Sequence, residues 1–323
     1  MAEKGEATQI PCNDGERRSR VFRLRECCSL PARGRAGQGM KRGCGMQLPT
    51  KQQSDNIRAR LNYIVDTGIP PVQYIDWPEM VEKAIPAQYQ LHEVTIRDGR
   101  PQRDRFQLDT HGFVFVDQET QVKDFADQDE VKRIYEPEVH ALIKRYSGAS
   151  KVVVINQWIR LGDEARRIAT GARPPVKRVH SDYTENTARW WLREIVGDAE
   201  AERRMKKRFA IIQVWRPIRG DVMVDPLAIC DARSIPPECF ILVERRYPYR
   251  RTGEVYQIAY HPSHVWYWFP RMTRNEALVF KVFDSDESKP ARRTPHTAFD
   301  HPVPPVNAPP RESIETRTFA FFD

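Results

Sequence analysis

Hydrophobic positions recur with helical spacing in two stretches of the chain. Residues 128–147 place one set of apolar side chains on a single helical face: Val131, Ile134, Tyr135, Val139, Leu142 and Ile143. Pro137 lies inside this pattern and is expected to bend or interrupt the helix. A second helix is predicted around residues 187–207, and a short one is predicted to start with Asp76 as N-cap and Pro78 in its first turn.

Short apolar runs separated by turn residues dominate the rest of the chain. The β-branched run at residues 151–155 is typical of a buried strand, and residues 106–116 alternate up to a turn at His111-Gly112. Further strands are predicted at residues 209–215, 227–230, 239–244, 255–260, 265–269, 277–283 and 313–321. This pattern predicts a mainly β fold with flanking helices around a jelly-roll or sandwich core, with helices gathered in the first half.

The first 48 residues differ in composition from the remainder. They hold ten Lys or Arg against five Asp or Glu, so they carry +5 of the net charge of +8. We therefore predict a disordered basic extension at 1–48 and a single domain over 52–323. Because the remaining +3 is ordinary for a globular surface, nucleic-acid binding is not expected.

The lengths of the apolar runs and the positions of the cysteines indicate in which cellular compartment the protein is expected. No run approaches the roughly eighteen apolar residues that a membrane span needs, and the start lacks the apolar segment of a secretory signal. Six cysteines are present without a CxxC pair or regular spacing, which argues against zinc and against a disulfide framework. We expect a cytoplasmic protein with free thiols and without membrane contact; its oligomeric state does not follow from the sequence.

A single His-x-Asp in the chain, His180 to Asp182, is a candidate metal site. Non-haem iron oxygenases hold iron(II) on one face with two histidines and one carboxylate, which leaves the opposite face open for 2-oxoglutarate and dioxygen. Positions i and i+2 of a strand point to the same side, so His-x-Asp supplies two such ligands at once. One His-x-Asp is weak evidence alone, since a structural histidine is the commoner case.

The order of motifs after this pair strengthens the interpretation. His296 follows a run of predicted strands, and Arg311-Glu-Ser313 opens the last strand. A guanidinium can fork onto the distal carboxylate of 2-oxoglutarate while a hydroxyl adds a further hydrogen bond. Alternation keeps Arg311, Ser313 and Arg317 on one face, so either arginine could bind the cosubstrate, and a charged edge strand is the alternative explanation.

At these residues the chain resembles the fungal and bacterial family of non-haem iron(II)/2-oxoglutarate oxygenases, hydroxylases and desaturases among them, that includes the gibberellin desaturase and the cephem methoxylase component. The resemblance covers roughly residues 56–323. The matching segments include residues 179–184 (VHSDYT), 214–218 (VWRPI), 226–234 (PLAICDARS), 264–272 (HVWYWFPRM), 295–299 (PHTAF) and 310–317 (PRESIETR).

The resemblance implies a double-stranded β-helix in which His180, Asp182 and His296 bind iron and the 311–317 strand binds 2-oxoglutarate. The implied reaction oxidises an unactivated C–H bond of a small molecule of secondary metabolism, by hydroxylation, desaturation or oxidative cyclisation. Two departures are visible. The spacing of fifteen residues from His296 to Arg311 exceeds the roughly ten that is common in plant-type enzymes, and Gln213 stands where the family pattern has Asn.

The sequence leaves the substrate contacts and the exact activity open. Tyr183 and Asn186 follow the first two candidate ligands closely and are candidate substrate contacts. Arg216 could meet an anionic substrate, or it could pack and pair inside the protein. Two other functions compete with the oxygenase: an iron oxidase that does without 2-oxoglutarate, and a jelly roll that binds a ligand without turnover.

Overall fold

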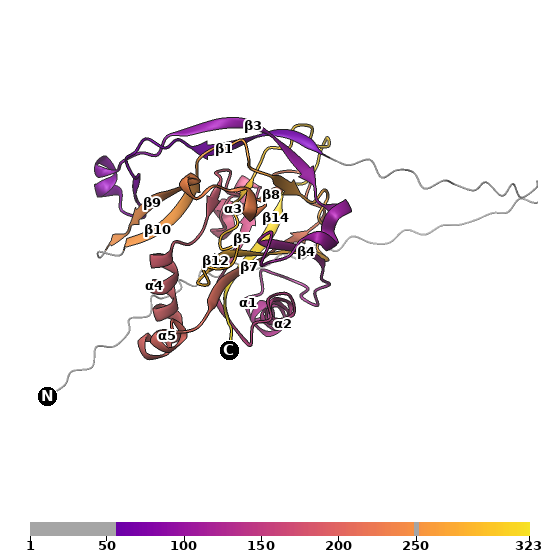
Figure 1. Cartoon of the computed structure of the whole chain (residues 1–323). Coiled ribbons are helices and arrows are strands. Elements are labelled where there is room, and N and C mark those ends of the chain that lie inside the picture. Colours follow the sequence, from indigo (N-terminus) through magenta and orange to yellow (C-terminus); the bar gives the residue numbers. More distant parts are fainter. Residues whose placement is uncertain (1–55, 249–251) are drawn as a thin grey trace, which may run out of the picture. The chain divides into compact units, whose positions relative to one another are not determined.

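Two β-sheets form the framework of the protein in this computed structural model, which describes residues 56–248 and 252–323 (Figure 1). The predicted extension at 1–48 lies outside the described residues. The strands of the larger sheet are β1 (Ile57–Ile64), β2 (Val72–Tyr74), β3 (Tyr89–Asp98), β6 (His180–Ser181), β8 (Leu227–Cys230), β9 (Phe240–Arg246), β10 (Thr252–Ile258), β11 (Trp266–Trp268) and β13 (His296–Ala298). Their order across the sheet is β1-β3-β11-β8-β13-β6-β10-β9-β2.

The smaller sheet is built from longer strands. They are β4 (Phe113–Asp117), β5 (Lys151–Leu161), β7 (Phe209–Arg219), β12 (Glu276–Asp284) and β14 (Glu312–Phe321). Their order is β4-β12-β7-β14-β5, with every pair antiparallel. The three central strands are almost wholly buried, so both faces of β7 and β12 carry apolar side chains and these strands appear as nearly continuous apolar runs in the sequence.

Helices and 3-10 turns connect the strands. The α-helices are α1 (Gln128–Glu130), α2 (Glu136–Ser147), α3 (Glu164–Thr170), α4 (Glu185–Val196) and α5 (Asp198–Arg204). The shorter helical elements are η1 (Pro78–Lys83), η2 (Arg100–Arg105), η3 (Val131–Tyr135), η4 (Ala232–Ser234) and η5 (Pro237–Cys239). None of the described helices is long and apolar enough to cross a bilayer.

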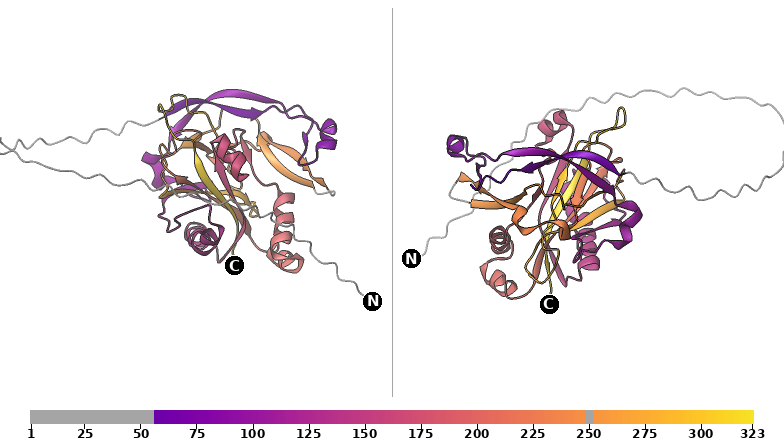
Figure 2. Two further views of the ribbon diagram at one scale, coloured as in Figure 1. Left: turned by 180° about the vertical axis from the view of Figure 1, so that it is seen from behind. Right: turned by 45° about the horizontal axis from the view of Figure 1, so that its top comes forward.

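The smaller sheet has a covered outer face and an inner face that meets the larger sheet. Helix α2 packs its apolar side, with Val139, Leu142 and Ile143, against the outer face of β5, β7 and β14 (Figure 1). The inner face contributes large side chains such as Trp215 and Phe280 to a core shared with Tyr267 of β11. Away from α2, helix α4 lies beside β10, which forms a hairpin with β9 (Figure 2).

The mainly β, jelly-roll prediction is confirmed, and the bounds of the strands predicted from residue 209 onward differ from the observed bounds by at most four residues. The helix predicted at 128–147 is present as α1, the π-helix η3 and α2 in succession. Pro137 lies in the first turn of α2, and its missing N–H and its ring disturb regular bonding just before it. The 187–207 helix is divided at Gly197, whose φ is +80°.

One expectation held only in part and another was wrong. All five described α-helices lie before residue 205, but strands β1 to β6 lie there as well, so this half is not mainly helical. Strands β1 and β3 pair with each other over eight residues and leave much of their outer surface exposed, which weakens the apolar signal. Asp76 is not an N-cap, because it has a left-handed φ of 53° and Trp77 precedes η1.

Candidate active site

Two very short neighbouring strands bring the three candidate metal ligands together. His180 begins β6 and His296 begins β13, and they are cross-strand partners in an antiparallel pair. Asp182 follows two residues after His180, so strand alternation turns both side chains to the same side. His180 and His296 are far apart in the sequence and are neighbours on one sheet.

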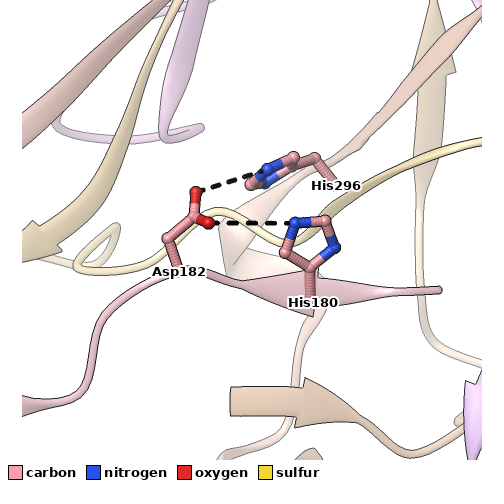
Figure 3. A group of neighbouring side chains, drawn as sticks. All are labelled: His180, Asp182 and His296. Atoms are coloured by element: carbon pink, nitrogen blue, oxygen red, sulfur yellow. Dashed lines mark ion pairs between the residues drawn. The ribbon is translucent and has the colours of Figure 1, made fainter. Parts of the chain in front are cut away.

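The ligand atoms converge on one point. His180 Nε2 lies 3.9 Å from Asp182 Oδ1, and His296 Nε2 lies 3.6 Å from Asp182 Oδ2 (Figure 3). One ligand atom from each residue lies within 4.8 Å of the other two. Atoms bound at right angles about 2.1 Å from a metal are about 3 Å apart, so shifts below about 1 Å would close this set around an ion.

Hydrogen bonds fix the orientation of both imidazoles. His180 Nδ1 donates to the carbonyl of Arg178 at 2.7 Å, and His296 Nδ1 donates to the carbonyl of Thr294 at 3.1 Å. A proton on Nδ1 leaves the lone pair on Nε2, the atom that faces Asp182. Burial lowers the pKa of both histidines, that of His180 to about 3, so both are neutral and able to bind a metal.

Asp182 is held ionised with one oxygen left free. Burial alone would raise its pKa, but the charge of Arg317, followed by the two histidines, brings the pKa below the usual carboxyl range. Arg317 Nη2 donates to Oδ1 at 2.9 Å, whereas Oδ2 is buried and has no hydrogen-bond partner among the described residues. Oδ1 of this carboxylate faces His180 Nε2 and the buried, unpaired Oδ2 faces His296 Nε2. Two imidazole nitrogens around one carboxylate are the donor set of a metal centre, so these residues fit iron(II).

A narrow cavity leads from the two histidines into the space between the sheets. It is lined by Arg160, Val176, His180, Gln213, Trp215, Leu227, His296, Ala298, Arg311 and Glu315. The larger sheet supplies the histidines, and β5, β7 and β14 of the smaller sheet supply the polar side chains. Both amide atoms of Gln213 are buried and lack a partner among the described residues, so this cavity contains polar atoms ready to bind a ligand.

Arg311 lies in the wall of this cavity. Its side chain is only 3 % exposed, its Nη1 donates to the carbonyl of Asp225 at 2.6 Å, and the guanidinium lies over the ring of Trp215. Burial lowers its pKa to about 10, so the group is still charged at neutral pH. No carboxylate of the described residues pairs with it, and Ser313 on the same face has a buried, unpartnered hydroxyl.

Arg317 lies on β14, six residues after Arg311, and has different partners. Its Nη2 contacts both Asp182 and Glu315, the latter at 2.8 Å. Glu315 in turn accepts two hydrogen bonds of 2.7 Å from Arg160 of β5. A continuous row of alternating charges, Arg160–Glu315–Arg317–Asp182, therefore ends on the candidate metal ligand and fixes its carboxylate.

A wider cleft of about 590 Å³ opens on the other side of His180 and Asp182. Its wall includes aromatic side chains, Trp158, Tyr183, Trp190, Trp191 and Tyr247, and the polar residues Arg178, Thr187, Arg245, Glu254 and Gln257. Elements β5, β6, α4, β9 and β10 thus contribute to one hollow beside the metal ligands. It is large enough for a small organic molecule.

The three candidate substrate contacts have three different positions. Tyr183 is buried and lines the wide cleft. Asn186 is exposed on α4 and donates to Glu254 at 3.3 Å, outside the cleft wall. Arg216 is not brought to the site at all: it points to the outer face of the smaller sheet, 1 % exposed, and donates to the carbonyls of Gln118 and Arg274.

Sequence patterns gave no sign of Arg160, Glu315 or Arg245 as parts of this site. Arg160 and Glu315 meet across two strands that are 155 positions apart in the chain. Each residue alone looks like a charged position in an ordinary strand, and a single sequence contains no signal that pairs them.

The jelly roll, the His/Asp/His cluster and the adjoining cavity are together typical of non-haem iron oxygenases. Comparisons agree with this class. Residues 61–321 match the family described as "Oxidoreductase/YMDC permease-like domain". Among curated relatives, the Fe(II)/2-oxoglutarate-dependent dioxygenase nvfI of Aspergillus novofumigatus is 35 % identical over 71 % of this chain and 83 % of its own. The hydroxylase/desaturase CTB9 of Cercospora beticola is 36 % identical over 73 % and 78 %.

A solved structure has the same fold. The iron and alpha-ketoglutarate-dependent endoperoxidase NvfI aligns over 82 % of this chain and 98 % of its own, with a TM-score of 0.75 and 30 % identity. The chain belongs to this family of Fe(II)/2-oxoglutarate-dependent dioxygenases, hydroxylases and desaturases of fungal secondary metabolism. It is an oxidoreductase of a small-molecule substrate whose cofactors are iron(II), 2-oxoglutarate and dioxygen, which favours the oxygenase over the two competing functions.

Proposed function

We propose that His180, Asp182 and His296 bind the iron(II), and that Arg311 with Ser313 binds the distal carboxylate of 2-oxoglutarate. The observation that carries this proposal is that His180 lines both the narrow cavity and the wide cleft. A metal at this point would meet a cosubstrate from one side and a substrate from the other.

The choice of Arg311 over Arg317 rests on their partners. Arg317 already contacts two carboxylates, one of which is Asp182. Arg311 contacts no carboxylate of the described residues, and it lines the narrow cavity together with both histidines. A buried cation without a counter-charge is costly, so a carboxylate of the cosubstrate at Arg311 would relieve that cost.

Iron(II) with 2-oxoglutarate supplies the oxidising power, since dioxygen and the oxidative decarboxylation of 2-oxoglutarate together drive the oxidation of a C–H bond. The side chains do the rest. The hydrogen bonds to Arg178 and Thr294 keep each Nε2 unprotonated, and Arg317 holds Oδ1 of Asp182, which faces His180, while Oδ2 faces His296. Trp215 and Arg311 pack on each other in the wall of the narrow cavity.

The substrate is proposed to bind in the wide cleft, with Tyr183 in its wall. Hydroxylation, desaturation and oxidative cyclisation are all compatible with this arrangement, because the direction of the bound C–H bond decides among them. We further propose that residues 52–323 act as one catalytic domain and that the enzyme is cytoplasmic. The described cysteines, Cys230 and Cys239, are both free thiols, which supports a reducing compartment.

The test is an anaerobic titration of the purified full chain with iron(II) and then 2-oxoglutarate, followed by visible difference spectroscopy. We expect a weak metal-to-ligand charge-transfer band in the unsubstituted protein. Arg311→Ala should lose the band at cosubstrate concentrations that saturate the parent, while bound iron stays stoichiometric. His180→Ala and His296→Ala should lose both iron and band.

Two matched arginine variants complete the design. Arg317→Ala should bind iron more weakly but show the band once iron is saturating. Arg203→Ala, at an arginine that is 75 % exposed on α5, should behave like the parent. A band that persists in Arg311→Ala and disappears in Arg317→Ala at saturating iron would assign 2-oxoglutarate to Arg317 and overturn the proposal.

A further inference from the structure

One arginine in the wide cleft has no role in the site as described so far. Arg245 lies on β9, directly opposite Gly253 of β10, and both residues line the cleft. Gly253 carries no side chain, and the ring of Tyr247 lies 3.4 Å from the point where its Cβ would stand. An aromatic ring therefore lies next to this arginine in the wall of the cleft.

Arg173 and Arg178 of the same cleft, like Arg245, have no carboxylate partner among the described residues. Arg173 lies over the ring of Trp158, however, and Arg178 donates to Tyr89. Neither kind of contact is found for Arg245 among the described residues. The next residue, Arg246, forks onto Glu244 with bonds of 2.7 and 3.1 Å. Arg160 and Arg317 both contact Glu315. Arg245 has neither a hydrogen bond nor an ion pair with any described residue, and its Nε is buried and unpartnered.

The charges that line the cleft are unbalanced. The arginines are Arg160, Arg173, Arg178, Arg245 and Arg317, and the carboxylates are Asp76, Asp182 and Glu254. Two of these carboxylates are already in use, since Asp182 pairs with Arg317 and Glu254 accepts from Thr184 at 2.6 Å.

The electrostatic surroundings of Arg245 place it near the metal ligands. Burial lowers its pKa, the Tyr247 and Asp182 side chains raise it, and Arg178 and Arg317 lower it further. A guanidinium remains charged at neutral pH even so, because its ordinary pKa is above 12. A half-buried, unpaired cation in the same cleft as Asp182 is a place where an anion would be stabilised.

We propose that Arg245 binds a carboxylate of the substrate, so that this enzyme oxidises an organic acid whose apolar body packs on the aromatic wall. This inference rests on the proposed placement of iron and substrate. One fork on one unpaired arginine suits a monoanionic carboxylate. A phosphate would require further donors, but Arg178 is engaged with Tyr89 and Arg173 is stacked on Trp158.

The proposal is tested on the full-length, anaerobic iron(II)–2-oxoglutarate complex with 2-naphthoate and 2-naphthamide as a matched pair of probes, and 2-naphthyl phosphate as a third. Binding is measured by equilibrium dialysis, which is independent of the charge-transfer band. We expect 2-naphthoate to bind the parent at least about tenfold more tightly than 2-naphthamide. This preference should vanish in Arg245→Ala and be only partly retained in Arg245→Lys.

Two further readouts separate this role from a structural one. The charge-transfer band without probe should be the same in Arg245→Ala as in the parent, and the melting temperature should be unchanged or higher, because removing an unpaired cation costs no ion pair. Absence of the charge-transfer band in the parent protein would contradict the proposed function, whereas the dialysis result would still test the role of Arg245. Equal preference for 2-naphthoate in parent and Arg245→Ala, displacement of 2-oxoglutarate by 2-naphthoate, or Arg245-dependent binding of the phosphate alone would overturn the proposal.

Discussion

The two faces of the smaller sheet each bury an arginine, and the two arginines have opposite surroundings. Arg216 and Arg311 are 1 % and 3 % exposed, and burial lowers the pKa of both. On the outer face, Arg216 donates to two backbone carbonyls and has Glu138 of α2 at 4.0 Å. On the inner face, Arg311 donates to one carbonyl, has no carboxylate partner in the described chain, and lines a cavity.

Burial and residue type therefore do not identify a binding residue. Arg216 lies on β7 and Arg311 directly precedes β14, and the sequence marked both as candidates. What distinguishes them is whether the protein itself supplies the counter-charge. The outer face is closed by α2 and its arginine is structural, whereas the inner face leaves a charge for a ligand to neutralise.

The largest effect is expected at the outer face. Arg216→Met leaves Glu138 and two carbonyls without their buried donor, so the free energy of unfolding should fall by about 3 kcal/mol or more. Urea unfolding of the purified protein measures this. The folded fraction should bind 2-oxoglutarate with parental affinity, and a weakened cosubstrate affinity with intact stability would reverse the assignment of the two faces.

An arginine-to-methionine substitution on the inner face should weaken the binding of 2-oxoglutarate without a loss of stability. Arg311→Met removes a cation that has no protein counter-charge, so stability should be unchanged or higher. The affinity for 2-oxoglutarate should fall by about 2 kcal/mol or more, which is roughly 30-fold. Anaerobic titration of the charge-transfer band gives the affinity, and a stability loss as large as that of Arg216→Met would break the comparison.

Gly112 joins the smaller sheet to the candidate iron ligand. It has a φ of +91°, its carbonyl accepts from the Lys281 N–H and the Thr294 hydroxyl, and a Cβ there would meet Thr294 Oγ1. Gly112→Ala should therefore cost about 1–3 kcal/mol in stability and weaken iron binding, because the carbonyl of Thr294 orients His296.

A double-mutant cycle with Thr294→Ala isolates the cause of this effect. The second substitution removes the clashing hydroxyl, so the double variant should be more stable than the sum of the two single losses allows. Strictly additive losses would attribute the effect to the backbone alone and remove the link to His296.

The smallest effect is expected at Asp109, at the edge of the outer face, and concerns the pH dependence of the free energy of unfolding. Burial alone would raise the pKa of Asp109, but Lys281, Lys289 and Arg208 bring it below the usual carboxyl value of about 4. A lowered folded-state pKa gives stability that is present above pH 4 and is lost as pH falls further. Asp109→Asn should flatten this acid limb by less than about 1 kcal/mol, because the side chain is 46 % exposed.

Acid unfolding followed by circular dichroism measures that limb. Asp117→Asn is the matched control, since Asp117 is 74 % exposed and pairs with a single arginine. An acid limb in Asp109→Asn as steep as in the parent would show that this ion cluster contributes nothing to stability.

Much of the fold could be predicted because its signals are local. Strands such as β7 and β12 are nearly continuous apolar runs, and helix α2 has a regular 3.6-residue period. The strands β6 and β13 have two and three residues, too few to show a period, yet they carry the candidate iron ligands. Motif spacing found His180 and His296, although no pattern predicted those strands.

The sequence by itself determined the class of the enzyme and the candidate ligand set, because residue types at fixed spacing define that chemistry. Only the tertiary structure decided how the arginines differ. Arg311 directly precedes β14 and Arg317 lies on it, and period-two alternation puts both on one face and treats them alike. Glu315 of the same strand and Asp182, which follows β6, pair with Arg317, whereas no described carboxylate pairs with Arg311. Asp182 is distant in sequence and Glu315 lies between the two arginines, so only the packed structure shows which arginine these carboxylates neutralise.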